Sequence, residues 1–157
     1  MVCGPKVALA NFLDLVALGT VADVVTLDYN NRILVEQGLR RIRANHCCPG
    51  IRALLQVSKR EQTYLVASDL AFFLGPRLNA AGRMDDMSYG IACLLSEDET
   101  TALQHAQLLD NFNQERRFVE EGMQEEALQR LDKLGDPATL PIGLCLFEET
   151  WHQGVIG

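Results

Sequence analysis

The segment 98–134 constrains the fold more than any other part of the chain. Its apolar side chains recur at three-, four- and seven-residue steps: Leu109, Phe112, Val119, Met123, Ala127 and Leu131. This spacing gathers apolar side chains on one face of an α-helix, and acidic residues fill the positions between them. The segment therefore predicts one long amphipathic helix, longer than a compact domain usually needs.

The residues before this segment predict further helices. Residues 11–25 are apolar on nearly every side, which indicates a helix buried on most of its faces. Residues 30–44 place apolar side chains on one side and arginines on the other, and an asparagine is available to cap the helix start. Two shorter helices are expected to begin at Pro49 and at a Ser68 cap, and Gly75-Pro76 should bend or end the second of them.

The last part of the chain has a different pattern. Residues 135–141 are rich in turn formers, and the apolar residues 142–147 that follow predict a short buried strand. Residues 150–157 begin a further element. We therefore expect a mainly α fold and a chain that is an internal piece of a larger protein.

The composition favours a soluble globular protein. The chain has 157 residues, of which 48% are hydrophobic, so it can bury a core. Because the sequence has neither an apolar run of about 18 residues nor a signal-peptide pattern, we expect a cytoplasmic protein without membrane contact. The cysteines are odd in number, and only Cys47 and Cys48 are close, so we expect buried free thiols, not a disulfide framework or a zinc site.

The charge of the chain is unevenly distributed. The formal net charge is −7, but residues 28–60 carry a net +5 and residues 84–136 a net −9. Nucleic-acid affinity rests mainly on Lys and Arg, so we do not expect a polyanion to bind over the whole surface. The basic segment is compatible with a local arginine-rich binding patch or with an ordinary solvated helix face.

Asp23 lies within the apolar run 13–28, and these apolar surroundings predict that its carboxylate is buried. A buried carboxylate persists when it meets an arginine, accepts several hydrogen bonds or ligates a metal. Gly19 and Ala22 reduce the side-chain bulk nearby and would let another backbone approach. Asp14 faces the other side of the helix, so the two acids form no carboxylate pair. A structural and a functional role for Asp23 both remain open.

Two other stretches carry candidate binding residues. Arg77, Asn79 and Arg83 are separated by small residues, a composition suited to clamping phosphate, although the spacing matches neither the Walker pattern nor the dinucleotide fingerprint. The arginines could equally pair with acids inside the fold, namely Asp69, Asp85 or Asp86. His152 follows Trp151 at an expected strand-to-helix junction, where backbone amides favour anions, but a single histidine is a weak signal.

Three stretches, residues 13–42, 72–95 and 151–157, closely resemble in this order the RecJ family of single-strand-specific DNA exonucleases, which belongs to the DHH phosphoesterase superfamily. The resemblance covers nearly the whole chain. The sequence departs from it at Thr26, where the family usually has proline, but this position lies in a turn and is not a ligand.

The resemblance implies a catalytic role for Asp23. Members of the family hold two divalent ions, usually Mn²⁺ and sometimes Mg²⁺, and the aspartate that matches Asp23 is one of the metal ligands. Two such ions polarise a phosphodiester and lower the pKa of a bridging water. The other ligands, including the Asp-His-His triplet that names the superfamily, are absent from this sequence. We therefore expect this chain alone to bind no metal and to be inactive.

The resemblance also implies how the chain is organised. Residues 1–97 would be the C-terminal helical part of a DHH α/β nuclease domain, residues 98–136 a connecting helix, and residues 137–157 the start of a DHHA1-type domain with its first strand. Arg77, Asn79, Arg83 and His152 would contact the DNA strand.

Two functional hypotheses follow. In the first, the chain is part of a 5′-to-3′ single-stranded-DNA exonuclease of DNA repair and recombination, with DNA-repair proteins as further partners. In the second, it is a non-catalytic helical scaffold whose acidic helix binds other proteins. An Asp-His-His motif encoded upstream would exclude the scaffold. In either case, apolar surface left uncovered by missing parts should make the chain self-associate.

Overall fold

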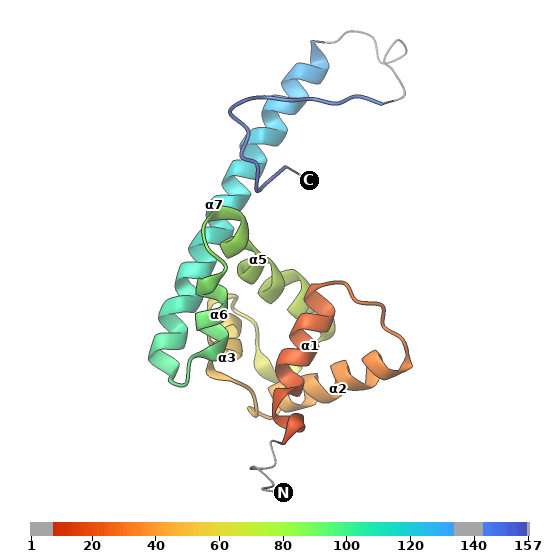
Figure 1. Cartoon of the computed structure of the whole chain (residues 1–157), viewed down its shortest axis with the longest axis vertical. Helices are drawn as coiled ribbons and strands as arrows, with labels where there is room; N and C mark the ends of the chain where they lie inside the picture. Colours follow the sequence, from red (N-terminus) through yellow and green to blue (C-terminus); the bar gives the residue numbers. More distant parts are fainter. Residues whose placement is uncertain (1–7, 134–142, 157) are drawn as a thin grey trace, which may run out of the picture.

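The structure is a computed structural model that describes residues 8–133 and 143–156, and these residues are mainly helical, as predicted (Figure 1). In chain order the elements are η1 (Leu9–Phe12), α1 (Leu13–Ala22), α2 (Tyr29–Arg43), α3 (Pro49–Val57), η2 (Gln62–Tyr64), α4 (Ala67–Asp69), η3 (Leu70–Leu74), α5 (Gly75–Met84), α6 (Ser88–Leu95) and α7 (Glu99–Asp132). The buried apolar side chains of these helices form one core.

Helices α1 and α2 cross at very close range. A Cβ atom at Gly38 would overlap the carbonyl oxygen of Leu13 and the Cβ of Ala17, so this contact requires glycine. The expected cap of α2 was wrong by a few residues: the carboxylate of Asp28, not an asparagine side chain, accepts the N–H of Asn31 at 2.8 Å. An acid suits this position because it also meets the positive end of the helix dipole.

Helix α1 is less buried than its sequence predicts. Asp14, Ala17 and Leu18 are its buried residues, whereas the side chain of Val16 is 38% exposed. The expectation of a helix buried on most faces was therefore wrong. One side of α1 packs on α2, η3 and α5, and another side borders an open apolar groove.

Residues 67–84 form one helical run that changes its winding before Pro76. Proline has no N–H and its ring clashes with the carbonyl four residues earlier. The π-helical turn η3 directly precedes Gly75-Pro76 and accommodates this conflict, so the helical run continues through these residues and does not end there. Ser68 is not the cap, because the Asp69 carboxylate accepts the N–H of Val66 at 2.9 Å.

Helix α7 confirms the predicted long helix. It spans Glu99–Asp132, and the side chain of Asp98 caps its start by accepting the N–H of Thr101 at 2.8 Å. Its buried residues all lie in its first half, which packs against α3, α5 and α6. The second half extends beyond the other helices (Figure 1). Positions 134–136 of the predicted helix lie outside the described residues.

The C-terminal segment 143–156 runs back along α7 (Figure 1). Trp151 Nε1 donates to Glu126 Oε2 at 2.8 Å, and Arg130 forms an ion pair with Glu148. Residues 143–147 do not form the predicted strand, and Phe147 is 74% exposed. A strand requires a neighbouring strand to satisfy its backbone, and the described residues contain none. Residue 142 and the predicted linker 135–141 lie outside the described residues.

The described cysteines are free, but they differ in exposure. Cys93 is buried, Cys47 and Cys48 are half-buried, and Cys145 is exposed, so the expectation of buried thiols holds for only part of the set. Burial raises the pKa of the Cys47 and Cys93 thiols to about 11. Cys3 lies outside the described residues.

No helix in the described part of the chain is long and apolar enough to cross a membrane.

Candidate functional site

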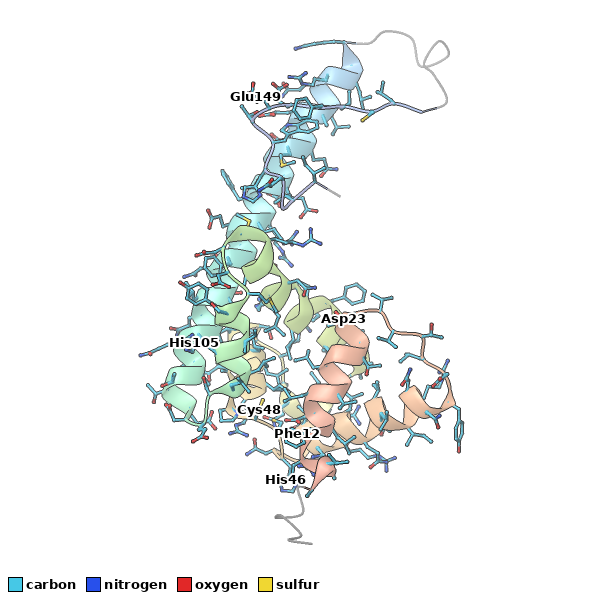
Figure 2. All side chains as sticks on the ribbon, in the orientation of Figure 1. Phe12, Asp23, His46, Cys48, His105 and Glu149 are labelled. Atoms are coloured by element: carbon cyan, nitrogen blue, oxygen red, sulfur yellow. The ribbon has the colours of Figure 1, made fainter. Side chains whose placement is uncertain are left out.

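Asp23 lies at the C-terminal end of α1 and is exposed, so the expectation of a buried carboxylate was wrong (Figure 2). Helix α1 ends at Ala22, and the apolar residues that follow are outside the helix. The backbone N–H of Asp23 still donates to the carbonyl of Gly19 at 3.0 Å. The helix therefore fixes the backbone of Asp23, while its side chain lies at the surface.

The chain reverses immediately after Asp23. The N–H of Val25 donates to Thr20 O at 3.0 Å and that of Val24 to Val21 O at 3.2 Å, the two bonds of a Schellman cap. Val24 has φ 55°, in the left-handed region that glycine usually occupies. The left-handed conformation costs a residue with a side chain about 1–2 kcal/mol. The cap therefore includes a strained Val24 directly after Asp23.

Asp23 borders an apolar groove of about 340 Å³ between α1, α5 and α6. Asn79 is the second polar residue of the groove, and it comes from α5. The remaining lining residues are small or apolar: Leu15, Leu18, Gly19, Ala22, Leu78, Met87, Ile91, Leu94 and Leu95. The fold thus brings a carboxylate and an amide from sequence-distant helices to one apolar surface.

The buried acid of this region is Asp14, not Asp23. Asp14 is 2% exposed and accepts the N–H of Cys48 at 2.8 Å and that of Leu15 at 2.9 Å. These bonds tie α1 to the start of α3. From the sequence, Asp14 was considered only as a possible partner of Asp23, although Asp14 also lies in the apolar run.

Arg77 is held inside the fold. Its Nε donates to Asp110 Oδ1 at 2.8 Å and its Nη1 to Phe73 O at 2.7 Å, and its side chain is 12% exposed. The small residues that follow Arg77 in the sequence do not leave it uncovered, because Asp110 of α7 packs against it. Its partner is also none of the three acids considered, since Asp110 lies 33 positions further along the chain.

Arg83 and the segment around His152 contact each other. Arg83 Nη1 donates to Gly154 O at 3.0 Å, and a Cβ atom at Gly154 would overlap the carbonyl oxygen of Arg83. His152 Nδ1 accepts the N–H of Gly154 at 3.2 Å. The two predicted binding residues therefore lie at one junction between α5 and the C-terminal segment.

Arg83 and Asn79 also line a polar cavity of about 270 Å³, together with Pro76, Arg116, Glu120 and Val155. Asn79 lines both this cavity and the apolar groove beside Asp23, so the two sites are adjacent. Sequence reasoning missed Arg116, because the surrounding helix was interpreted only through its apolar spacing and its acidic residues. Its spacing of four residues from Glu120 was the available signal.

Comparison with known proteins identifies the chain. No protein-family model matches it. The "Single-stranded-DNA-specific exonuclease RecJ" of Dickeya dadantii is 61% identical over 152 residues, 95% of this chain, and that of Escherichia coli is 59% identical over 150 residues. A solved structure of RecJ bound to manganese is 33% identical and superimposes with a TM-score of 0.77 over 93% of this chain and 35% of its own. The chain belongs to the RecJ family.

The chain spans 26% of the length of these two curated RecJ relatives. A RecJ structure from Thermus thermophilus in complex with Mg²⁺ also matches, with 33% identity and a TM-score of 0.78 over 93% of this chain and 22% of its own. Mn²⁺ and Mg²⁺ are thus the ions found with RecJ proteins of this fold.

The residues described in this RecJ segment do not by themselves make a metal centre. The described part of the chain contains no group of three or more His, Cys, Asp or Glu side chains that could hold an ion. Asp23 offers one carboxylate, whereas divalent ions of this class need a nearly complete shell of oxygen and nitrogen ligands. A metal pair at Asp23 would require ligands from other parts of a RecJ protein.

Proposed function

We propose that this chain is part of a single-strand-specific DNA exonuclease that hydrolyses phosphodiester bonds in the 5′-to-3′ direction during DNA repair and recombination in the cytoplasm. The observation that supports this most strongly is the 61% identity to the RecJ exonuclease of Dickeya dadantii over 95% of the chain. A match over 95% of the chain includes the stretches that contain Asp23, Asn79 and Arg83.

In this function Asp23 is a ligand of a catalytic metal pair, Mn²⁺ or Mg²⁺. Its position supports the role: the carboxylate is exposed at the end of a capped helix and borders an open groove, so it is accessible to an ion. The metal pair would polarise the scissile phosphodiester. Asp23 itself would fix one side of the ion through the rigid end of α1.

Asn79, Arg83 and His152 are the proposed contacts to the DNA strand. Asn79 and Arg83 line one polar cavity, and Arg83 contacts the segment that carries His152. Arg77 is assigned to the packing of α5 on α7, because Asp110 and the Phe73 carbonyl already engage its guanidinium. Phosphate contacts of this kind position a strand without reading its bases.

The proposed domain organisation rests on the resemblance to the RecJ family. Residues 1–97 form the C-terminal part of the nuclease domain, residues 98–136 connect two domains, and residues 137–157 begin the second, DHHA1-type domain. The contact between Arg83 and Gly154 supports a junction of two units at this point.

Replacement of Asp23 in a full-length RecJ protein that carries this segment tests the function. We expect Asp23→Asn to reduce exonuclease activity on single-stranded DNA with Mn²⁺ by at least about 100-fold, because even partners of metal ligands contribute 10–100-fold. Asp132→Asn, an exposed acid at the end of α7, is the control and should leave the activity unchanged. Full activity of the Asp23 variant would exclude Asp23 as a ligand.

The non-catalytic scaffold remains the second candidate. The second half of α7 favours it, because this half is acidic and exposed and carries Phe118 with 78% exposure. A full-length protein that binds partner proteins but degrades no single-stranded DNA with either ion would support the scaffold and end the nuclease proposal.

A further inference from the structure

The polar cavity between α5, α7 and the C-terminal segment gathers positive charge from two helices. Its polar lining consists of Asn79 and Arg83 on α5 and of Arg116 and Glu120 on α7, and Pro76 and Val155 close it with apolar surface. Two guanidiniums and one carboxylate give the lining a net positive charge. A volume of about 270 Å³ is sufficient for a phosphate group.

Both arginines are oriented by a first contact within the protein. Arg116 Nη1 donates to Glu120 Oε2 at 2.6 Å, and Arg83 Nη1 donates to Gly154 O at 3.0 Å. A guanidinium has five N–H donors in a rigid fork, so one such bond leaves donors for a second acceptor. The two arginines are thus fixed but not saturated by the contacts in the described residues.

The two members of the Arg116–Glu120 pair differ in exposure. The Arg116 side chain is 19% exposed and the Glu120 side chain 54%. Glu120 can therefore rotate into solvent at little cost in solvation, whereas Arg116 stays in the cavity wall. An incoming phosphate oxygen would take the place of the Glu120 carboxylate, which has the same charge sign and the same acceptor geometry.

We infer that this cavity is a phosphate-binding site in which Arg116 is a further contact to the anion and Glu120 covers Arg116 until the anion enters. The inference rests on the proposed function, in which the anion is a backbone phosphate of a single DNA strand. It adds α7 to the strand-binding surface. Pro76 and Val155 offer no hydrogen bonds through their side chains, so the site should accept phosphate without regard to base sequence.

Neighbouring arginines on α7 provide a matched test. The 157-residue chain is titrated with a 5′-phosphorylated oligothymidylate and, separately, with inorganic phosphate. Arg116→Gln should weaken oligothymidylate binding about 10-fold, since a hydrogen bond to a charged group contributes roughly this much. Arg117→Gln removes the same charge from an exposed position outside the cavity and should change binding less than about 2-fold.

The acidic neighbours provide the second arm. Glu120→Gln should strengthen oligothymidylate binding about 5-fold, because it removes the carboxylate charge that pairs with Arg116. Glu121 lies outside the cavity, so Glu121→Gln should strengthen binding by less than about 2-fold. Thermal unfolding of each variant identifies any loss of fold. If Arg116→Gln unfolds the chain, the Glu120 and Glu121 variants decide the question.

Several results would overturn the inference: equal losses for the Arg116 and Arg117 variants, no gain for Glu120→Gln, or no binding of oligothymidylate by the unchanged chain. Binding of inorganic phosphate with the same variant pattern, but no binding of oligothymidylate, would assign the site to free phosphate and overturn the strand contact. These binding results are independent of nuclease activity, so a failure of the proposed hydrolysis would be recognised separately in the full-length protein.

Discussion

Replacement of Arg77 by alanine should destabilise the fold rather than remove a DNA contact. The Arg77 and Asp110 side chains are 12% and 20% exposed and meet at 2.8 Å. Asp110 also accepts a hydrogen bond from Gln114 Nε2 at 2.7 Å, and Arg77 donates to the carbonyl of Phe73. Alanine would leave Asp110 in a poorly hydrated position with Gln114 as its remaining partner in the described structure.

The magnitude follows from the exposure of the pair. Removal of one partner from a fully buried pair costs about 3–5 kcal/mol, and exposed pairs contribute about 0–1 kcal/mol. At the exposures of Arg77 and Asp110 we expect a loss of roughly 1.5–3 kcal/mol in the free energy of unfolding. For a chain of this size that loss lowers the Tm by roughly 3–12 °C.

Urea unfolding followed by circular dichroism measures this change, and Arg83→Ala is the matched control. Arg83 is exposed and donates to one backbone carbonyl, so its replacement should cost less than about 0.5 kcal/mol. A double-mutant cycle with Asp110→Ala should give a coupling energy of about 1–2 kcal/mol between Arg77 and Asp110.

The same variants in a full-length RecJ protein separate the two roles of the arginines. Arg83→Ala should reduce the slope of log affinity against log salt by roughly 0.7, as expected for one lost phosphate contact to a single strand. Arg77→Ala should leave the slope unchanged. If Arg77→Ala has the stability of Arg83→Ala and a reduced salt slope, the internal role of Arg77 is refuted.

Three further predictions concern packing, ionisation and catalysis. Gly38→Ala should lower the free energy of unfolding by about 1–3 kcal/mol, because the added Cβ would overlap α1. Gly122→Ala, whose added Cβ meets open space on α7, should raise the free energy of unfolding by about 0.5–1 kcal/mol. Urea unfolding measures both variants, and equal effects would contradict the close crossing of α1 and α2. Alkylation at pH 8 followed by mass spectrometry should modify exposed Cys145 well before Cys93, because burial raises the pKa of the Cys93 thiol to about 11; rapid modification of Cys93 would refute this protection. In the unfolded chain this thiol has the ordinary pKa of 9.0, so the contribution of Cys93 to the free energy of unfolding should decrease as the pH rises from 9 to 11. The 157-residue chain alone should show no exonuclease activity with Mn²⁺, because one carboxylate cannot hold a metal pair; activity that persists through repeated purification and is abolished by Asp23→Asn would refute this.

The sequence by itself determined the helices, because helix formation depends on local spacing. The apolar period along 98–134 predicted α7, and Pro49 predicted the start of α3. Caps were less certain, since several polar residues compete near one helix start: Asp28 caps α2 although asparagines follow it. The winding change before Pro76 also depends on how the flanking helix packs, so composition indicated a disturbance but not its form.

Only the tertiary structure decided which charged groups are buried and what they contact. Asp14 and Asp23 lie in one apolar run, yet the first is buried and the second exposed, because burial depends on which helices cover each face. Residues 143–147 have the composition of a strand, but no strand in the described residues is available to pair with them.

The arginines illustrate the same dependence on long-range packing. Arg77 and Arg83 have similar small neighbours in sequence, but α7 brings Asp110 to the first and the C-terminal segment brings Gly154 to the second. Arg116 enters the polar cavity for the same reason, since α7 runs past α5 at that point. Local spacing fixes the helices, whereas the partners of a charged side chain are fixed by contacts between residues tens of positions apart, which no local pattern encodes.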